Sequence, residues 1–255
     1  MAVQAIDHLV IMFPDLETAI RDYAELGFTV VPGGAHPTGT HNALIAFADG
    51  AYIELIAFER NNAQHRWWEP AQKGGGLIDF CMRTDDLTGD MEIFRNAGVE
   101  MQIAPGERVR PDGYQLRWTL AQPIAPHAFV APFLIEDTTP REERVPREHR
   151  HRNGVTGIAA ITIATEDLTG PRRWGSAVLH QEGEPLRRED LFARGVRFMT
   201  GPHALEFLAP EQASSPLSPW LKSRGAGPWS VTLKSAASSG SLDESKARAH
   251  VILVH

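Results

Sequence analysis

The chain has one cysteine, Cys81, among its 255 residues, so it cannot form an internal disulfide. It has no stretch near the ~20 consecutive apolar residues that span a bilayer. Its opening residues, MAVQAIDHLV, lack the basic region and the cleavage site of a signal peptide. These absences exclude disulfide-stabilised scaffolds and helical membrane proteins, and we expect a soluble protein of the cytoplasm, which is a reducing compartment.

An excess of positive charge is also lacking, since the chain has 25 Lys and Arg residues against 32 Asp and Glu residues and a formal net charge of −7 at pH 7. No stripe of Lys and Arg with interleaved aromatic residues indicates a nucleic-acid-binding face. The chain has no Walker loop, no GxGxxG that opens a helix after a strand, no GxSxG elbow and no CxxC spacing. We therefore expect neither nucleic acid nor a membrane as a partner, and the common nucleotide-binding and serine-hydrolase sites are excluded.

What the chain does contain is a βαβββ pattern over residues 5–58. A nearly continuous apolar run rich in branched residues predicts the first strand. Asp15 then fits the N-cap of a helix whose apolar residues recur at helical spacing up to Gly27. Three more strands follow, separated by a Pro-Gly-Gly loop and an Asp-Gly turn. The four predicted strands are Ile6–Phe13, Phe28–Val31, Asn42–Phe47 and Ala51–Phe58.

The same pattern recurs along the chain. Asp15-Leu16 and Gly27 reappear 71 positions later as Asp86-Leu87 and Gly98, and the Asp-Leu pair returns at a shift of 152. At that second shift YIELIA matches ALEFLA, which places Glu206 under Glu54. The last stretch, residues 228–254, reads as strand, helix and strand, a fourth unit cut short. Such repeats predict supersecondary units that share a core, and hence an α+β fold of repeated βαβββ units.

Three irregular segments interrupt the repeats, of which residues 211–227 are rich in Ser, Pro and Ala. Residues 136–154 are charged and lack periodicity, which predicts a linker in which the run EHRHR is a solvated connection. We therefore expect two domains, residues 1–140 with two units and residues 152–255 with a degenerate second half. Residues 61–76 hold Trp67-Trp68 and end in three glycines. Neighbouring tryptophans either cover a core edge or wall a pocket.

Two polar side chains interrupt the apolar strands of the first unit. His8 is in phase with Ile6 and Val10, and Glu54 is in phase with Tyr52 and Ile56. Because strand side chains alternate between faces, each polar group shares a face with apolar neighbours. An ionised Glu on such a face is costly unless it is paired, hydrogen-bonded or bound to a cation. The first unit is therefore a candidate site, although a lone His in a strand also occurs as a hydrogen-bonded core residue.

These features resemble a known family. Paired βαβββ units with a His in the first strand and a Glu in the last resemble the vicinal oxygen chelate superfamily, which includes glyoxalase I, ring-cleaving dioxygenases and bleomycin-resistance proteins. More closely, IDHLVIMFPDLETAIRDYAELGFTVVPGG, VRPDGYQLRWTLAQ and HRNGVTGIAAITI resemble the glyoxalase-like domain family. The resemblance implies cupped half-barrels that bind a ligand inside, with any metal held by the first and last strands of each unit.

The resemblance also implies a metal site in the first half. His8 and Glu54 match two ligand positions, and the shift of 71 places Asp79 under His8, where it stands either as a ligand or as a buried acid held by an Arg. Such a donor set suits a divalent ion such as Zn²⁺, Mn²⁺ or Fe²⁺. Glu54 is then a ligand or a catalytic proton shuttle. In the third unit Ala160 stands under His8, so we expect Glu206 to belong to a structural copy.

Several further residues are candidates for substrate binding. His36, His41 and Asn42 stand in a polar loop that enters a strand, where they serve either turn chemistry or hydrogen bonds at the cavity mouth. Arg117, with Arg108 and Arg110, is either solvated or turned towards the cavity to attract an anion. Trp118 is either a core residue or a stacking platform.

Two classes of function remain. The first is a metal-assisted lyase, isomerase or dioxygenase that acts on a small oxygen-rich substrate, whose oxygens the ion would polarise. The second is a metal-free protein that binds or sequesters a small molecule in the same cup, as bleomycin-resistance proteins do. The expected partners are a small-molecule ligand and a second copy of the chain in a homodimer.

Overall fold

The first unit is built around a helix whose ends are marked in its sequence. The computed structural model describes Val3 and residues 5–255. After strand β1 (Ala5–Met12), Asp15 caps helix α1 (Leu16–Glu25), since its Oδ2 accepts a hydrogen bond from the Thr18 amide at 2.8 Å. Gly27 follows with a φ of +91°. Both predicted ends of the helix are therefore confirmed.

The second strand lies later in the chain than predicted. We expected Phe28–Val31 to be the strand and Pro-Gly-Gly to be a loop, whereas β2 (Val31–Ala35) contains that motif. Gly34 has a φ of +137°, and a Cβ there would lie 1.9 Å from the carbonyl oxygen of Val109. Glycine therefore lets β2 approach β6 closely, and here it marks a contact between strands rather than their end.

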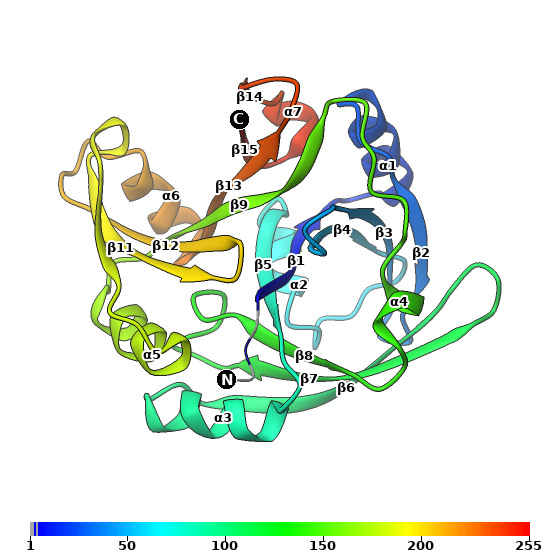
Figure 1. Cartoon of the computed structure of the whole chain (residues 1–255), viewed down its shortest axis with the longest axis horizontal. Helices are drawn as coiled ribbons and strands as arrows, with labels where there is room; N and C mark the ends of the chain where they lie inside the picture. Colours follow the sequence, from blue (N-terminus) through cyan, green and yellow to red (C-terminus); the bar gives the residue numbers. More distant parts are fainter. Residues whose placement is uncertain (1–2, 4) are drawn as a thin grey trace.

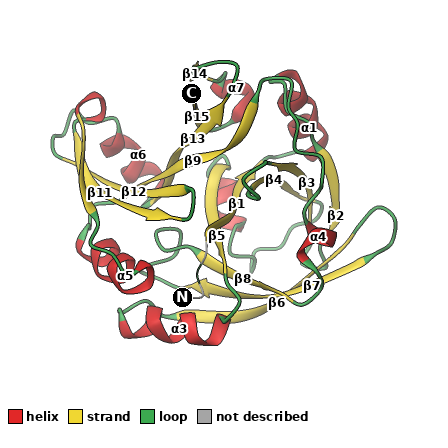
Figure 2. Ribbon diagram, viewed as in Figure 1, coloured by secondary structure: helices red, strands yellow, loops and turns green. Residues whose placement is uncertain are grey.

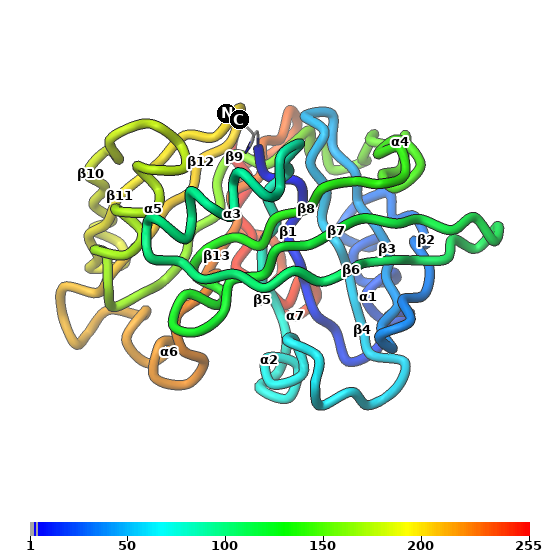
Figure 3. The backbone as a smooth tube through the Cα atoms, turned by 90° about the horizontal axis from the view of Figure 1, so that it is seen from below, coloured from blue at the N-terminus to red at the C-terminus, as the bar shows by residue number. Residues whose placement is uncertain are grey.

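The first two units close into one barrel. Its strands follow the order β1-β4-β3-β2-β6-β7-β8-β5, and β5 pairs with β1 to complete the ring (Figure 1). The hairpin of β6 and β7 projects beyond the rest of the barrel (Figure 3). The other elements of this half are β3 (Thr40–Ala46), β4 (Tyr52–Phe58), α2 (Trp68–Gln72), β5 (Gly76–Arg83), α3 (Leu87–Asn96), β6 (Met101–Val109), β7 (Gln115–Pro123) and β8 (Phe133–Asp137).

The remaining units form an open sheet. Its order is β10-β11-β12-β9-β13-β15-β14, so the fourth unit is short, as predicted, with one added two-residue strand. The elements are β9 (Val155–Ala164), α5 (Thr169–Leu179), β10 (Glu184–Arg188), a 3₁₀ turn (Glu189–Leu191), β11 (Ala193–Thr200), β12 (His203–Pro210), α6 (Leu217–Arg224), β13 (Gly227–Ser235), β14 (Gly240–Ser241), α7 (Glu244–Ala247) and β15 (His250–Val254).

The crossover helices α1, α3 and α5 lie outside the strands (Figure 2). Each follows the first strand of its unit, as the βαβββ pattern predicts.

In the part of the chain that the structure describes, no helix combines the length and the apolar character needed to cross a membrane.

The strand register confirms the repeat at a shift of 152 positions. In the parallel pair β1 and β4, Val10 lies opposite Glu54. In the parallel pair β9 and β12, Thr162 lies opposite Glu206, at the same shift on both strands. The predicted α+β fold of repeated units is therefore confirmed, and the two halves have the same strand register at the position of the acidic residue.

The two halves share one hydrophobic core. Leu9 of β1 and Phe80 of β5 belong to the same buried cluster as Ile161 of β9 and Val231 of β13. Polar contacts join the halves as well: buried His203 accepts a hydrogen bond from the Ile6 amide at 3.2 Å, and its other ring nitrogen lies 3.2 Å from the Asp49 carboxylate. The predicted division at residues 140–152 stays a prediction, but this core crosses it.

The segment predicted to be a linker is only partly solvated. His149 and Arg150 are exposed, as expected for a connection. Helix α4 (Arg141–Arg144), by contrast, packs against the barrel, and the Arg144 side chain is only 2% exposed. His151 also binds the barrel, with its Nε2 2.9 Å from the carbonyl oxygen of Ala46. The reason is that charges in this segment find partners in distant strands, which local sequence does not reveal.

Candidate ligand-binding site

The barrel encloses a cavity of about 920 Å³. Strands β1, β3, β4, β6, β7 and β8 supply its wall, and residues 62–67 supply part of its rim. Four of the predicted site residues that line it are His8, His36, Asn42 and Glu54. The lining combines aromatic, amide, carboxylate and guanidinium groups, which suits a polar ligand with several oxygen atoms.

His8 is held rigidly in the cavity wall. Its ring stacks on Tyr52, with centroids 4.6 Å apart, and meets the edge of Phe133 at 5.3 Å. Nδ1 lies 2.7 Å from Asp7 Oδ1, and Nε2 lies 3.5 Å from Glu54 Oε2. His8 and Glu54, which the sequence predicted to share a site, are therefore neighbours.

Asp7 and His8 are consecutive in the chain, yet their side chains bond to each other because β1 bulges there. Ile6 pairs with Met82 and His8 pairs with Cys81, so Asp7 is an extra residue relative to β5. A bulge breaks the alternation of side chains and redirects them locally. Asp7 was not among the residues predicted for the site, and the only signal for it in the sequence is a charged residue inside an apolar strand.

Asp7 is buried, and two arginines hold it ionised. Arg144 donates hydrogen bonds to both of its oxygens, and Arg141 donates to Oδ2 at 2.9 Å. Burial raises the pKa of Asp7, but the charge of Arg144, the hydrogen bond from His8 and the charge of Arg141 together hold it well below the usual value. An ionised Asp7 accepts the hydrogen on His8 Nδ1, which leaves Nε2 directed at Glu54.

Glu54 is linked to a buried cation through one amide. Asn42 Nδ2 donates to Glu54 Oε1 at 2.6 Å, and Arg108 Nη1 donates to Asn42 Oδ1 at 3.4 Å. Arg108 is 3% exposed, and burial lowers the pKa of its guanidinium. Its Nη2 donates to the Arg144 carbonyl, but its Nε has no hydrogen-bond partner among the described residues. The cavity wall therefore contains an unused buried donor.

The other predicted substrate-binding residues divide between two faces. His36, Arg117 and Trp118 line the cavity, and the His36 ring meets the Trp118 ring edge-on at 6.2 Å. Burial lowers the pKa of His36. His41 is not among the lining residues, and its Nδ1 lies 3.5 Å from Glu59 outside the barrel.

Asp79 is not gathered with His8 and Glu54. It is fully buried, accepts a hydrogen bond from Trp67 Nε1 at 2.7 Å and lies 2.8 Å from Arg66 Nη2. Burial raises its pKa, while Arg66 and Trp67 act in the opposite direction. Of the two interpretations of Asp79, the structure therefore matches that of a buried acid held by a neighbouring Arg.

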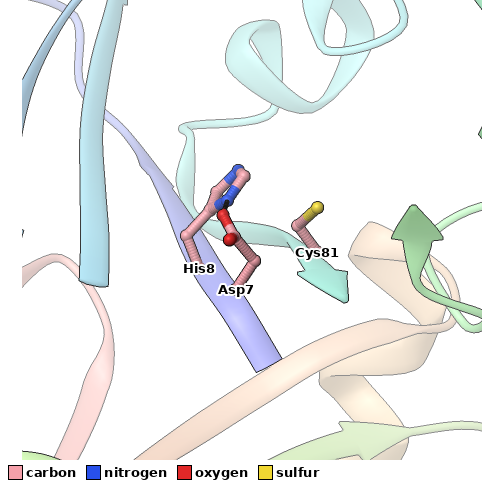
Figure 4. A group of neighbouring side chains, drawn as sticks. All are labelled: Asp7, His8 and Cys81. Atoms are coloured by element: carbon pink, nitrogen blue, oxygen red, sulfur yellow. Dashed lines mark hydrogen bonds and ion pairs between the residues drawn. The ribbon is translucent and has the colours of Figure 1, made fainter. Parts of the chain in front are cut away.

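Among the described residues, one group of side chains brings three potential metal-ligand atoms within 4.8 Å of one another. These atoms belong to Asp7, His8 and Cys81 (Figure 4). Their donor atoms are already engaged or protonated. Asp7 and His8 bond to each other, Asp7 faces two guanidinium groups, and burial raises the pKa of the Cys81 thiol well above its usual value. This group is therefore a poor ligand set.

The cavity side offers better geometry but too few ligands. The 3.5 Å between His8 Nε2 and Glu54 Oε2 is near the ~3.4 Å expected for two ligands bound tetrahedrally at ~2.0–2.2 Å. On β8, Phe133 and Ile135 line the cavity where a further ligand would stand. Catalytic zinc sites use three protein ligands, so this donor set does not fit an ion held by the protein alone.

The fold and cavity define the class of protein. A closed barrel of two βαβββ units, with a second sheet in the same register, is a vicinal oxygen chelate fold. The model of the glyoxalase-like domain family matches residues 6–179, and the protein belongs to that family. A comparison with curated proteins finds no match.

Solved structures confirm this fold at low sequence identity. A hypothetical protein from Staphylococcus aureus has a TM-score of 0.70 at 15% identity, with 98% of each chain covered. A mutant of 4-hydroxymandelate synthase from Streptomyces coelicolor has a TM-score of 0.58 at 13% identity, with 92% of this chain and 71% of that chain covered. A fusion protein of a xylose isomerase-like TIM barrel and 4-hydroxyphenylpyruvate dioxygenase has a TM-score of 0.55 at 15% identity, with 91% of this chain and 37% of that chain covered.

Proposed function

We propose that the barrel cavity binds a small oxygen-rich molecule, that Arg108 binds one of its oxygen atoms, and that Glu54 and His8 exchange a proton with it. The observation that carries this proposal is the unpaired Nε of Arg108, which is buried in the same cavity wall as the Glu54–His8 pair. A buried donor without a partner costs about 1–3 kcal/mol, which a ligand oxygen would recover.

The arrangement supports proton transfer. Because His8 Nδ1 is hydrogen-bonded to Asp7, His8 Nε2 and the neighbouring Glu54 Oε2 are the atoms available for a proton. A guanidinium that binds the ligand oxygen would stabilise negative charge as it forms there. This chemistry corresponds to a lyase or an isomerase. A protein that only sequesters the molecule would use the same contacts, and turnover of the bound ligand distinguishes the two.

Calorimetric titration with short hydroxy and oxo carboxylates, such as lactate, pyruvate and glyoxylate, tests the proposal. We expect at least one compound to bind the native chain, and Arg108→Gln to weaken that binding about tenfold or more. Glu54→Gln should remove binding of the compound in the barrel, and with it any proton exchange between the compound and solvent. His41→Gln is the matched control, because His41 lies outside the cavity. Equal affinities for native protein, R108Q and H41Q would contradict the proposal.

A metal ion at His8 and Glu54 is tested separately. Because no third His, Cys, Asp or Glu ligand atom of the described residues gathers with His8 Nε2 and Glu54 within 4.8 Å, we expect no tightly held divalent ion after purification without an affinity tag. We also expect no effect of a chelator on ligand binding. Elemental analysis and titration with Zn²⁺, Mn²⁺ and Fe²⁺ measure this. One ion per chain, lost in His8→Ala, would instead support the metal-assisted reaction. The homodimer stays a prediction, which sedimentation of the purified chain would test.

A further inference from the structure

A pair of hollows, separate from the barrel cavity, lies at the seam between the barrel and the open sheet. One, of about 330 Å³, is lined by Trp220, Trp229, Arg224, Arg248 and His250. The other, of about 100 Å³, adjoins it, because both share Leu77, Trp220, Arg224 and Pro228. None of the residues that line the barrel cavity lines either hollow.

Two arginines in the seam lack acidic partners. Arg224 donates to the carbonyl oxygen of Gly75, and Arg248 donates to the neighbouring carbonyl of Gly74 at 2.9 Å. Within the part of the chain that the structure describes, neither guanidinium forms an ion pair with a carboxylate. Burial and the charge of Arg248 lower the pKa of Arg224, so the two like charges oppose each other. An anion between them would relieve this repulsion.

The carboxylates near these arginines are already engaged. Glu69, at the smaller hollow, lies 2.7 Å from Lys73 Nζ. Glu244, at the larger hollow, lies 2.6 Å from His250 Nδ1. The charged residues that line the two hollows are three cations, Lys73, Arg224 and Arg248, and two carboxylates, Glu69 and Glu244, so positive charge in the seam exceeds negative charge.

Aromatic rings and apolar side chains stand next to these charges. The rings of Trp220 and Trp229 meet edge-on at 5.6 Å, and the ring of His250 lies 4.2 Å from that of Trp229. The smaller hollow adds Ile78 and Phe129. Such a wall offers stacking and apolar contact to a ring, while the arginines attract an attached anionic group.

The three glycines that end the irregular stretch shape this seam. Gly74, Gly75 and Gly76 have φ values of +100°, +63° and +84°, which glycine adopts readily. A Cβ on Gly76 would lie 2.5 Å from the Arg248 carbonyl oxygen. The glycines thus allow the loop to approach α7 closely enough for its carbonyl groups to hold both guanidinium groups side by side.

We propose that this seam is a second binding site, separate from the barrel cavity, for a small aromatic anion that carries a phosphate or carboxylate group. Arg224 and Arg248 bind the anionic group, and the ring packs against Trp220 and Trp229. The contacts that carry the proposal do not involve His8, Glu54 or Arg108, so it does not depend on the function proposed for the barrel.

Calorimetric titration of the full chain with phenyl phosphate tests this site. We expect one seam site per chain, with affinity reduced about tenfold or more in the double variant Arg224→Gln, Arg248→Gln. Arg95→Gln is the matched control, since Arg95 is exposed on α3 and pairs with Glu92. R95Q and R108Q should bind as the native chain does. The double variant Arg224→Lys, Arg248→Lys keeps both charges and should retain most of the affinity. It shows whether weaker binding by the glutamine double variant reflects the missing charges or a change in folding.

Two comparison compounds separate the parts of the proposal. Phenol lacks the anion and inorganic phosphate lacks the ring, so both should bind at least several-fold more weakly than phenyl phosphate. Unchanged affinity in the glutamine double variant would overturn the proposal. Loss of binding in R108Q instead would place the compound in the barrel and also overturn it. Phosphate that binds as tightly as phenyl phosphate would contradict a site for an aromatic ligand.

Discussion

Arg144 donates hydrogen bonds to both carboxylate oxygens of Asp7 from 137 residues further along the chain, at 2.9 Å to Oδ1 and 3.1 Å to Oδ2. It also donates to the Tyr52 hydroxyl at 2.7 Å and to both oxygens of Asp137. One side chain from the connecting segment thus fixes the residue that orients His8. The stability of the barrel and the geometry of the site depend on the same contact.

Arg144→Gln should lower the free energy of unfolding by about 3–5 kcal/mol, because it leaves a buried carboxylate without its main partner. Arg141→Gln is the matched control. Arg141 binds the same Asp7 oxygen from a side chain that is 22% exposed, so its loss should cost about 1 kcal/mol or less. Urea denaturation of the two variants measures both values. Equal losses would show that Arg144 is not the dominant partner.

Glu54→Gln should leave the stability of the ligand-free protein unchanged within about 1 kcal/mol, or raise it slightly, while removing ligand binding in the barrel. A carboxylate placed for function is often unfavourable for the empty fold. Thermal melts and ligand titrations measure the two effects.

Glu206→Gln is the matched variant in the second half. Both oxygens of the Glu206 carboxylate have hydrogen-bond donors, since Arg197 donates to Oε1 and Thr162 Oγ1 donates to Oε2 at 3.0 Å. Loss of the Glu206 carboxylate should therefore lower the free energy of unfolding by about 1 kcal/mol and leave ligand binding in the barrel intact. If E206Q abolished binding and E54Q did not, the working site would lie in the second half.

Acidification should destabilise the protein through His65. Burial, with the charges of His36 and Arg66, lowers the pKa of His65 to about 4, and its Nδ1 accepts a hydrogen bond from the Trp67 amide at 3.2 Å. The folded state therefore favours neutral His65, so this contribution to stability is complete above pH ~6.5 and falls as pH decreases towards 4, by at most about 1.4 kcal/mol per pH unit.

Denaturation from pH 7 to pH 4 should accordingly show a shallower fall in stability for His65→Gln than for the native chain. His149→Gln, at an exposed position, should follow the native chain. Parallel curves for all three proteins would rule out His65 as a source of the pH dependence.

Gly34→Ala should destabilise the barrel by about 2 kcal/mol or more, because the new Cβ would lie 1.9 Å from the Val109 carbonyl where β2 meets β6. Gly50→Ala is the control, since Gly50 also has a positive φ, +85°, but has no atom within 4 Å of such a Cβ. It should cost about 1 kcal/mol. Thermal unfolding of both variants measures the difference, and similar melting temperatures would mean that β2 moves away without cost.

The sequence predicted His8 and Glu54 because each interrupts an apolar strand in phase, and it predicted the second half because a repeat conserves its offset. It did not separate His41 from Asn42, because the expected strand began at Asn42, whereas β3 begins two residues earlier. In a strand, consecutive side chains face opposite sides, so His41 and Asn42 separate. Strand boundaries decide such assignments, and Gly and Pro near them obscure the pattern.

Asp7 and Arg144 were beyond such reasoning for a different reason, and Arg108 stayed open between a solvated and a cavity-facing position. Each is a charged residue whose burial depends on a partner far along the chain. A local pattern assigns such residues to the solvated surface, which is correct for most arginines. Only the closure of the barrel brings Arg108 on β6 next to Asn42 on β3, and only the path of the connecting segment brings Arg144 to β1.

The core shared by the two halves has a consequence for dynamics. Strands β1 and β5, which carry His8, Asp7 and Asp79, pack against β9 and β13 in one buried cluster. Amide protons in all four strands should therefore exchange with solvent only when the whole chain unfolds, whereas the projecting β6–β7 hairpin should exchange by local opening. The wall that holds Arg108 can then adapt to a ligand while the wall that holds His8 stays fixed.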